Sequence, residues 1–77
     1  MNTSYSKDAA KVLSRLDVPT KHRIRAAIHG IPQGDIKKLR GSTNLCRLRV
    51  GIWRILFMHE DDGVFIADIV PRGDAYK

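Results

Sequence analysis

The chain has 77 residues, enough for one domain with a single hydrophobic core. It contains one cysteine and no His/Cys cluster with metal-ligand spacing, which excludes small folds held together by intramolecular disulfides or by zinc. Fourteen Lys and Arg residues against eight Asp and Glu residues give a formal net charge of +6, which favours nucleic acid, a ribosomal surface or an acidic protein as partner. The single cysteine fits a reducing, cytoplasmic setting. The N-terminal stretch MNTSYSKD has no apolar run, so we expect no signal peptide and no membrane span.

The first part of the chain is expected to supply a short edge strand at most, around residues 3–6, and then two helices joined by a tight connection, an αα-hairpin. Ser6 is the predicted N-cap of the first helix, and Thr20 that of the second. Gly30 is predicted to follow the second helix as its left-handed C′ residue. Each helix carries one apolar stripe at helical spacing, formed by Ala9, Val12, Leu13 and Leu16 and by Ile24, Ala27, Ile28 and Ile31.

Residues 31–41, with the sequence IPQGDIKKLRG, are expected to form a connection, punctuated by Pro and Gly, that returns the chain to a sheet. Lys37, Lys38 and Arg40 add positive charge to this segment. They fit either a solvated surface or contacts with phosphates.

Residues 45–70 predict three antiparallel strands joined by two tight turns. Apolar residues alternate with Arg47 and Arg49, which is typical of a half-buried strand. Gly51-Ile52 fits a type II′ hairpin loop, which sets Arg49 opposite Arg54. One face of this hairpin is then apolar, and the other carries the three arginines. Like charges opposite each other destabilise a sheet, so this second face is either a polyanion site or an ordinary solvated surface.

The second turn, Asp61-Asp62-Gly63, fits a three-residue loop with left-handed glycine. This loop sets Ile55 opposite Ile69 and Phe57 opposite Ala67. The predicted core face then gains Phe65, Ala67 and Ile69. The opposite face is too apolar for plain solvated surface and is a candidate docking groove for another chain; its expected members beside the arginine are Leu56, Met58, Val64, Ile66, Asp68 and Val70.

These elements predict an α+β fold, in which an N-terminal αα-hairpin packs on one face of a small twisted antiparallel β-sheet. Pro71 stops the last strand, and Gly73 allows the chain to bend after it. Arg72 and Tyr76 are therefore expected near the end of the sheet, within reach of the face that bears the arginines. His59 is expected near the exposed tip of the second hairpin, on its core-facing side, and is a minor candidate for acid–base chemistry.

The ordered set GDIKKLRG, CRLRVGIWRILF, an acidic turn, an apolar strand and PRGDAYK resembles the RelE/ParE toxin superfamily. It is most similar to the RelE-type mRNA interferases of type II toxin–antitoxin systems, and SKDAAKVLSRLD matches their first helix. The resemblance implies one RelE-like toxin domain over residues 1–77. It also implies a ribosome-dependent endoribonuclease that uses neither metal nor cofactor. In this chemistry the RNA 2′-hydroxyl attacks the adjacent phosphate and leaves a 2′,3′-cyclic phosphate and a 5′-hydroxyl.

The catalytic residues that the resemblance implies are Arg47, Arg49, Arg54, Arg72 and Tyr76. The positive charge of Lys37, Lys38 and Arg40 makes these three the predicted RNA-binding residues. Phosphoryl transfer gains most from cations fixed around the developing negative charge, a role that suits the strand arginines. Permanently charged guanidiniums are poor proton acceptors, so Tyr76 is the implied residue that activates the 2′-hydroxyl. Arg72 is implied to act at the leaving oxygen.

The partners that the resemblance implies are mRNA in the ribosomal A site and a separately encoded antitoxin, which binds the toxin in a hetero-oligomer. Two alternatives stay open. One is a ParE-like toxin that inhibits DNA gyrase by binding, without enzymatic activity. The other is an inactive basic module that binds nucleic acid.

Overall fold

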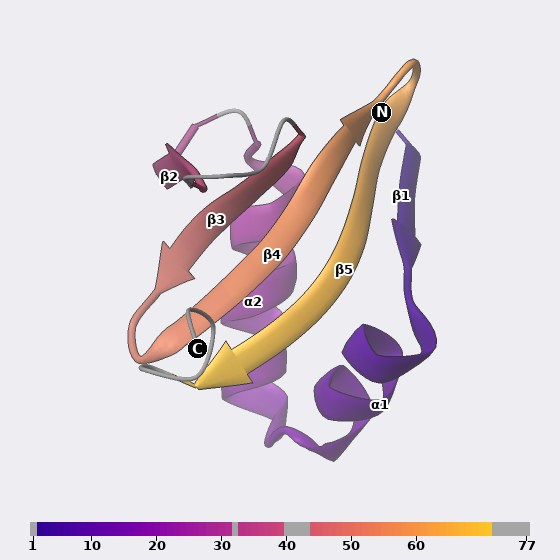
Figure 1. Cartoon of the computed structure of the whole chain (residues 1–77). Coiled ribbons are helices and arrows are strands. Elements are labelled where there is room, and N and C mark those ends of the chain that lie inside the picture. Colours follow the sequence, from indigo (N-terminus) through magenta and orange to yellow (C-terminus); the bar gives the residue numbers. More distant parts are fainter. Residues whose placement is uncertain (1, 32, 40–43, 72–77) are drawn as a thin grey trace.

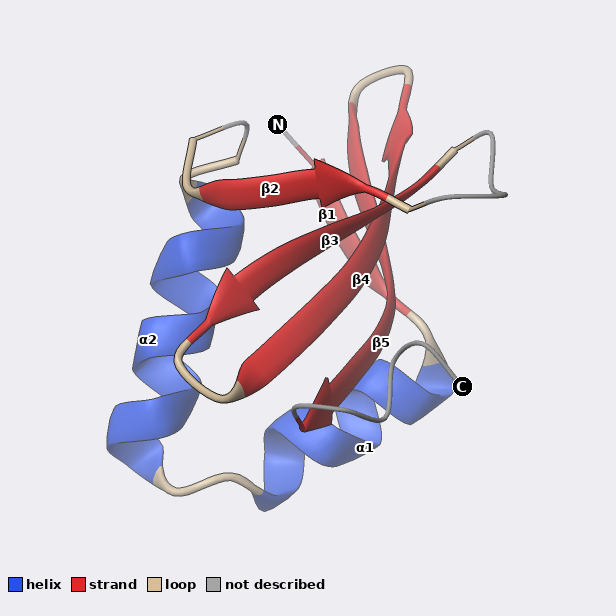
Figure 2. Ribbon diagram, turned by 60° about the vertical axis from the view of Figure 1, so that its left-hand side comes forward, coloured by secondary structure: helices blue, strands red, loops and turns tan. Residues whose placement is uncertain are grey.

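The structure, a computed structural model, describes residues 2–31, 33–39 and 44–71. Over these ranges the chain forms two helices and a five-stranded sheet of order β1-β5-β4-β3-β2, as Figure 1 shows. The elements in chain order are β1 (Asn2–Tyr5), α1 (Lys7–Arg15), α2 (Val18–His29), β2 (Asp35–Lys38), β3 (Leu45–Val50), β4 (Trp53–Glu60) and β5 (Gly63–Pro71). Both helices lie on the same side of the sheet (Figures 1 and 2). The α+β class and the packing of the helices on one face are therefore as predicted.

The starts of the two helices are set by their N-cap side chains. Ser6 caps α1 as predicted, because its Oγ accepts a hydrogen bond of 3.0 Å from the backbone N–H of Ala9. The predicted cap of α2, Thr20, is wrong. Asp17 is the N-cap, and its carboxylate accepts a 3.1 Å bond from the Thr20 N–H. Pro19 fits inside the first turn because a helix leaves those first N–H groups without intrahelical partners.

The end of α2 also differs from the prediction. Gly30 is the C-cap with a φ of −83°, in the right-handed region, and is not a left-handed C′ residue. Its N–H still bonds to the carbonyl oxygen of Ala26 at 3.0 Å, so the helical geometry continues to the cap.

The sheet is mixed, which corrects the expectation of an antiparallel one. β1 pairs with β5 in parallel, with Asn2 opposite Gly63 and Tyr5 opposite Ile66. Gly63 allows this close approach, because a Cβ there would overlap the carbonyl oxygen of Asn2. β2 is a second correction. Part of the expected connection pairs antiparallel with β3 as an edge strand.

The first predicted hairpin is confirmed residue by residue. Val50 pairs with Trp53, and Arg49 pairs with Arg54. A type II′ turn requires a positive φ at its first loop residue only. Gly51 has a φ of +61°, and the φ of Ile52 is not positive.

The register of the second hairpin was predicted only in part. Ile55 does face Ile69, but Phe57 faces Ile66, because a β-bulge shifts the pairing between Leu56 and Phe57. The loop is also shorter than expected, since Glu60 pairs with Gly63. Between this bulge and the β4–β5 turn, every side chain of β5 therefore points to the face opposite the predicted one. Val64 and Ile66, expected opposite the core, are therefore buried in it.

The hydrophobic core lies between the helices and the sheet. Its helical members come from the two predicted stripes, so that part of the prediction is confirmed. The buried core residues are Ala9, Leu13, Ile24, Ile28, Ile31, Leu48, Ile55, Phe57, Val64, Ile66 and Ile69. Helix α1 packs against β5 and β1, and α2 packs against β3. Neither described helix is long and apolar enough to cross a membrane.

Candidate active site

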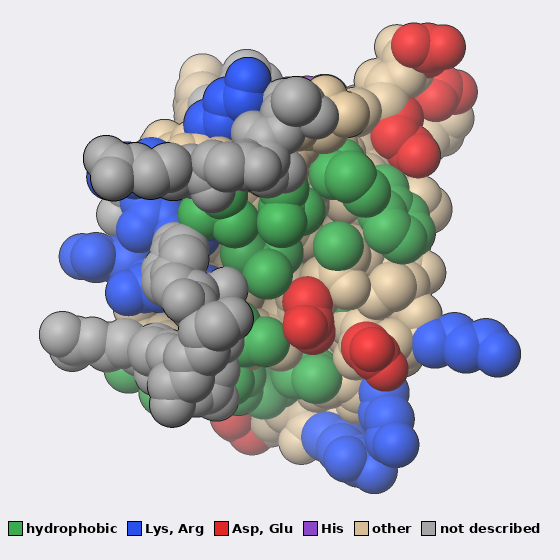
Figure 3. All heavy atoms as spheres, viewed as in Figure 1, with side chains coloured by type: hydrophobic (Ala, Val, Ile, Leu, Met, Phe, Trp, Pro, Cys, Tyr) green, Lys and Arg blue, Asp and Glu red, His purple; other side chains and the backbone are tan. Residues whose placement is uncertain are grey.

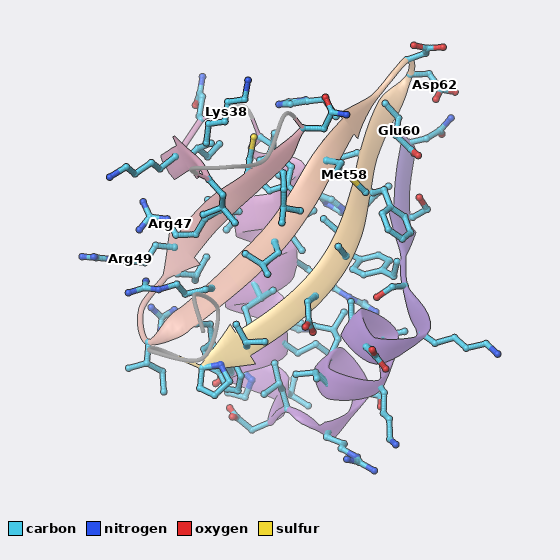
Figure 4. All side chains as sticks on the ribbon, in the orientation of Figure 1. Lys38, Arg47, Arg49, Met58, Glu60 and Asp62 are labelled. Carbon is cyan, nitrogen blue, oxygen red and sulfur yellow. The ribbon has the colours of Figure 1, made fainter. Side chains whose placement is uncertain are left out.

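The sheet face opposite the helices, hereafter the outer face, carries a cluster of cationic residues. Arg47 and Arg49 come from β3, and Arg54 comes from β4 directly opposite Arg49. Lys37 of β2 is the register partner of Arg47 and joins the same face, and the register partner of Arg49 in β2 is the acidic residue Asp35. We call Lys37, Arg47, Arg49 and Arg54 the arginine face. Figure 4 shows Arg47 and Arg49 projecting from β3 on the same side of the sheet.

The tight turn brings Arg49 and Arg54 close together. Val50 and Trp53 flank the two-residue loop as a hydrogen-bonded pair, so the next pair along is of the non-hydrogen-bonded kind. In such pairs the Cα atoms are only about 4.5 Å apart, and the side chains come closest. A cavity of about 130 Å³ opens beside them, lined by Arg49, Gly51, Ile52 and Arg54. Two permanent positive charges thus line one small cavity.

Burial holds part of this cluster in place. Arg47 and Arg54 are half-buried, while Arg49 is exposed. The Nε atom of Arg47 and the Nε and Nη1 atoms of Arg54 are shielded from solvent. Charges fixed in advance stabilise a developing anion better than mobile ones, because they need little reorganisation during the reaction. The arginine face is therefore suited to bind a phosphate and to stabilise its transition state.

The rest of the outer face is mainly apolar apart from Asp68, the register partner of Leu56, so it agrees with the predicted docking groove in character but only partly in membership. Because the bulge reverses the faces of this part of β5, Phe65 lies on the outer face, and Val64 and Ile66 lie in the core. We call its half-buried hydrophobic residues the apolar patch: Leu45, Leu56, Met58, Phe65 and Val70. Figure 3 shows this face, with hydrophobic side chains over β4 and β5, cations along the left edge and acidic side chains at the β4–β5 tip.

The other predicted residues are not all at this site. Lys38 pairs with Cys46 and lies on the opposite face from Lys37. It lines a separate cavity of about 190 Å³ with Asn44, Cys46 and His59. His59 is exposed and packs edge-on against Phe57, with ring centroids 5.5 Å apart. Both residues therefore lie away from the arginine face.

Arg40, Arg72 and Tyr76 lie outside the described residues, so their predicted roles remain predictions. Within the described ranges, no group of three His, Cys, Asp or Glu side chains is placed to hold a metal ion. The sequence reasoning missed Arg23 of α2. Its guanidinium lies beside the β3–β4 turn, where a Cβ on Gly51 would be 3.5 Å from its Nη2. This contact joins a helix to a distant turn, and no periodicity in the sequence predicts it.

The fold has counterparts among solved toxin–antitoxin complexes. The crystal structure of the archaeal RelE–RelB complex from Pyrococcus horikoshii OT3 matches with a TM-score of 0.74 and 26% identity, over 96% of this chain and 97% of that one. The RelB–RelE antitoxin–toxin complex from Methanococcus jannaschii matches with a TM-score of 0.73 and 24% identity, over 88% of each chain. No protein-family model and no curated protein matches the sequence. The structural matches confirm the resemblance to the RelE toxin superfamily over nearly the whole chain.

Proposed function

We propose that this protein is the toxin of a toxin–antitoxin pair and cleaves mRNA in the ribosomal A site. The observation that carries the proposal is the arginine face on a fold shared with RelE toxins. Arg49 and Arg54 line one cavity, and Arg47 stands next to Arg49 on the same face. A surface of this charge and spacing suits the phosphates of a single RNA strand.

The proposed reaction is an internal phosphoryl transfer within RNA. The ribose 2′-oxygen bonds to the adjacent phosphorus, and the bond from phosphorus to the 5′-oxygen of the next nucleotide breaks. The 2′-hydroxyl loses a proton and the leaving 5′-oxygen gains one, so the products are a 2′,3′-cyclic phosphate and a 5′-hydroxyl. The requirement for a 2′-hydroxyl restricts the reaction to RNA.

In this proposal the strand arginines are the electrostatic part of the site. Arg47 and Arg54, each with part of its guanidinium fixed by burial, bind the non-bridging phosphate oxygens where negative charge grows. Exposed Arg49 contacts the same phosphate from across the hairpin. Tyr76 is proposed to take the proton from the 2′-hydroxyl, since neighbouring cations favour an ionised phenol. Arg72 is proposed to stabilise the leaving oxygen.

The proposed partner is an antitoxin that covers the outer face. The two RelE structures described above are both complexes with RelB. The apolar patch gives such a partner a surface to bury, and the adjacent arginine face favours acidic residues in it. An antitoxin bound across both would exclude RNA from the arginines and form the expected hetero-oligomer. The proposed location is the cytoplasm, where the ribosome is found.

In vitro translation followed by primer extension tests the catalytic proposal. The wild-type chain should cut the mRNA at defined codon positions. Arg54→Gln should lower the cleavage rate by about 10² to 10³, the usual cost of removing one group that stabilises the transition-state anion. Tyr76→Phe and Arg72→Ala should abolish the same cuts. Arg15→Gln, an exposed change at the end of α1, is the charge-matched control and should leave the cuts unchanged.

Two results would contradict the proposal and select its alternatives. Uncut mRNA together with blocked gyrase supercoiling would indicate a ParE-like toxin. Uncut mRNA with unaffected gyrase would indicate a basic nucleic-acid-binding module. Variants of Arg54 and Tyr76 that cut as well as the wild type would exclude the arginine face as the catalytic site.

A further inference from the structure

The β3–β4 turn presents an exposed hydrophobic side chain at the end of the arginine face. Ile52 is 61% exposed, and of the described residues only Val18 is a comparably exposed large hydrophobic residue. Ile52 occupies the second position of the type II′ loop, where a polar residue would serve the turn equally well. A single exposed apolar residue is common on protein surfaces and proves nothing alone. Its surroundings make it informative.

Cationic side chains from three elements surround this turn. On the outer face, Arg49 of β3 and Arg54 of β4 line the cavity that Ile52 completes. On the other side, Arg23 of α2 extends to the turn, with its Nη2 at 3.5 Å from the position a Cβ would take on Gly51. Figure 2 shows the β3–β4 turn beside α2. The positive surface therefore continues around the end of the hairpin to α2.

Like charges gathered in one place attract anionic ligands, because a bound anion lowers their mutual repulsion. A ligand that fits must be longer than one phosphate, since the cations lie on both sides of the turn. It must also offer an apolar surface between its charges, to contact Ile52. Single-stranded RNA has both features: a chain of phosphates, and unstacked bases whose faces pack on apolar and guanidinium groups.

We propose that the β3–β4 turn is an RNA-binding subsite next to the scissile phosphate. Arg23 binds a flanking phosphate, and Ile52 packs against the face of the neighbouring base. This inference deepens the proposed function and rests on its RNA substrate. Because Ile52 has no hydrogen-bonding groups, the subsite holds the strand without selecting a base.

Binding of a short, fluorescently labelled RNA to the full-length protein tests the subsite. Full 2′-O-methylation of the RNA removes the attacking hydroxyl, so binding is measured without cleavage. Ile52→Ser should weaken binding about 5-fold, as expected when the apolar contact of one aliphatic side chain is lost, and should leave the salt dependence unchanged. Arg23→Gln should weaken binding several-fold and lower the slope of log K against log salt by about 0.7, as expected for one lost phosphate contact.

Arg25→Gln is the matched control, since Arg25 lies on the same helix but lines a different cavity, with Tyr5 and Leu13. It should change affinity by no more than about twofold, the ordinary range for a surface substitution. Equal losses of RNA affinity in the Arg23 and Arg25 variants would overturn the subsite, because the RNA would then be held only by diffuse electrostatic attraction. Normal RNA affinity with weaker antitoxin binding in the Arg23 and Ile52 variants would assign the turn to a protein partner, which also overturns it.

These outcomes are separable from the fate of the catalytic proposal. If the wild type cuts no mRNA but the variants of Arg23 and Ile52 bind the methylated RNA as predicted, the turn is an RNA subsite and only the proposed catalysis fails. If the wild type cuts mRNA and these variants bind like the control, only the subsite fails.

Discussion

Successive side chains of β4 lie in two contrasting environments. Ile55 and Phe57 point into the core and are 0% exposed. Arg54, Leu56 and Met58 alternate with them on the outer face and are only half-buried. The first set stabilises the fold. The second set places like charges opposite each other, at a cost of about 0.2–1 kcal/mol per pair, and leaves hydrophobic groups partly in water. The contrast teaches that the helix-covered face carries most of the stability of this small protein, while the outer face contributes less and is the face proposed to bind RNA and the antitoxin.

The strongest test of this contrast replaces one residue on each face. Phe57→Ala should lower the free energy of unfolding by about 3–5 kcal/mol, because it removes a large side chain from a packed core. Phe57→Leu should cost clearly less, since it keeps most of the volume. Arg49→Gln on the outer face should change the free energy by no more than about 0.5 kcal/mol, while reducing mRNA cleavage. Urea denaturation followed by circular dichroism measures all three.

A large loss of stability in Arg49→Gln would contradict this division between the faces. A Phe57→Ala variant that unfolds at the wild-type urea concentration would contradict it as well, because the core would then be unimportant to the fold.

The second test compares a crowded glycine with an open one. Gly63→Ala should lower the free energy of unfolding by about 1–3 kcal/mol, because its Cβ would overlap the backbone of Asn2 and push β1 away from β5. Gly30→Ala is the matched control. Its Cβ would lie at ordinary contact distance, 3.5 Å from the carbonyl oxygens of Ala26 and Ala27. There the loss of unfolded-state entropy should raise the free energy by about 0.4–1 kcal/mol.

If the two substitutions change the free energy of unfolding in opposite directions, the close contact between β1 and β5 is what excludes a side chain at Gly63. Amide hydrogen exchange provides a second measure, since β1 should lose protection in Gly63→Ala alone. Equal effects at the two positions would show that β1 adds nothing to stability.

The two hairpins show how far the sequence determines the fold. In the first, Gly51 needs a positive φ, and the apolar residues alternate with arginines, so turn and periodicity agree on one register. In the second hairpin, the segment VFIADIV has apolar residues at both odd and even positions, so no alternation reveals the extra residue of the bulge. Ala67 is the extra residue of the bulge, and a tertiary contact holds it there: the Oγ of Ser6 donates a 2.6 Å hydrogen bond to its carbonyl oxygen. That contact spans most of the chain and leaves no local pattern.

The positions of some residues of the candidate site were likewise predictable from the sequence, and those of others were not. Arg47, Arg49 and Arg54 were predictable, because a two-residue turn and period-two alternation place them together. The sequence did not predict that Lys37 and Lys38 lie on opposite faces of the sheet. The segment that holds them was expected to be a connection, but it is a strand with two faces. The position of Arg23 depends on how α2 packs against β3, which is a tertiary property.

The link between Ser6 and Ala67 provides the third test, at the half-buried cap of α1. Ser6→Ala removes the capping bond to Ala9 and the bond to the bulge, and should cost about 1–2 kcal/mol of unfolding free energy. Ser14→Ala is the control. Its Oγ donates only to the exposed carbonyl oxygen of Lys11 within the same helix, so its loss should be within about 0.5 kcal/mol. If both serine variants unfold alike, the bond to the bulge contributes nothing.

The smallest effect is expected at the exposed cap of α2, and it should depend on pH. Hydrogen bonds from the side chain and then the backbone N–H of Thr20 hold the pKa of the Asp17 carboxyl below its ordinary value. A carboxyl whose pKa is lower in the folded chain stabilises the fold fully above its unfolded pKa of about 3.9, and loses that contribution as the pH falls through the folded value. Asp17→Ala should therefore lower the urea midpoint slightly at neutral pH, by a difference that stays constant down to about pH 4 and shrinks below it.

Asp17→Asn separates the cap from the charge, because asparagine also caps helices but does not titrate. Its urea midpoint should stay nearer the wild type than that of Asp17→Ala at neutral pH, and the gap between the two variants should not follow the carboxyl titration. A difference between wild type and Asp17→Ala that persists unchanged at the lowest pH would mean that ionised Asp17 does not stabilise α2. The contrast between the two caps would then depend only on the bond that joins Ser6 to the sheet.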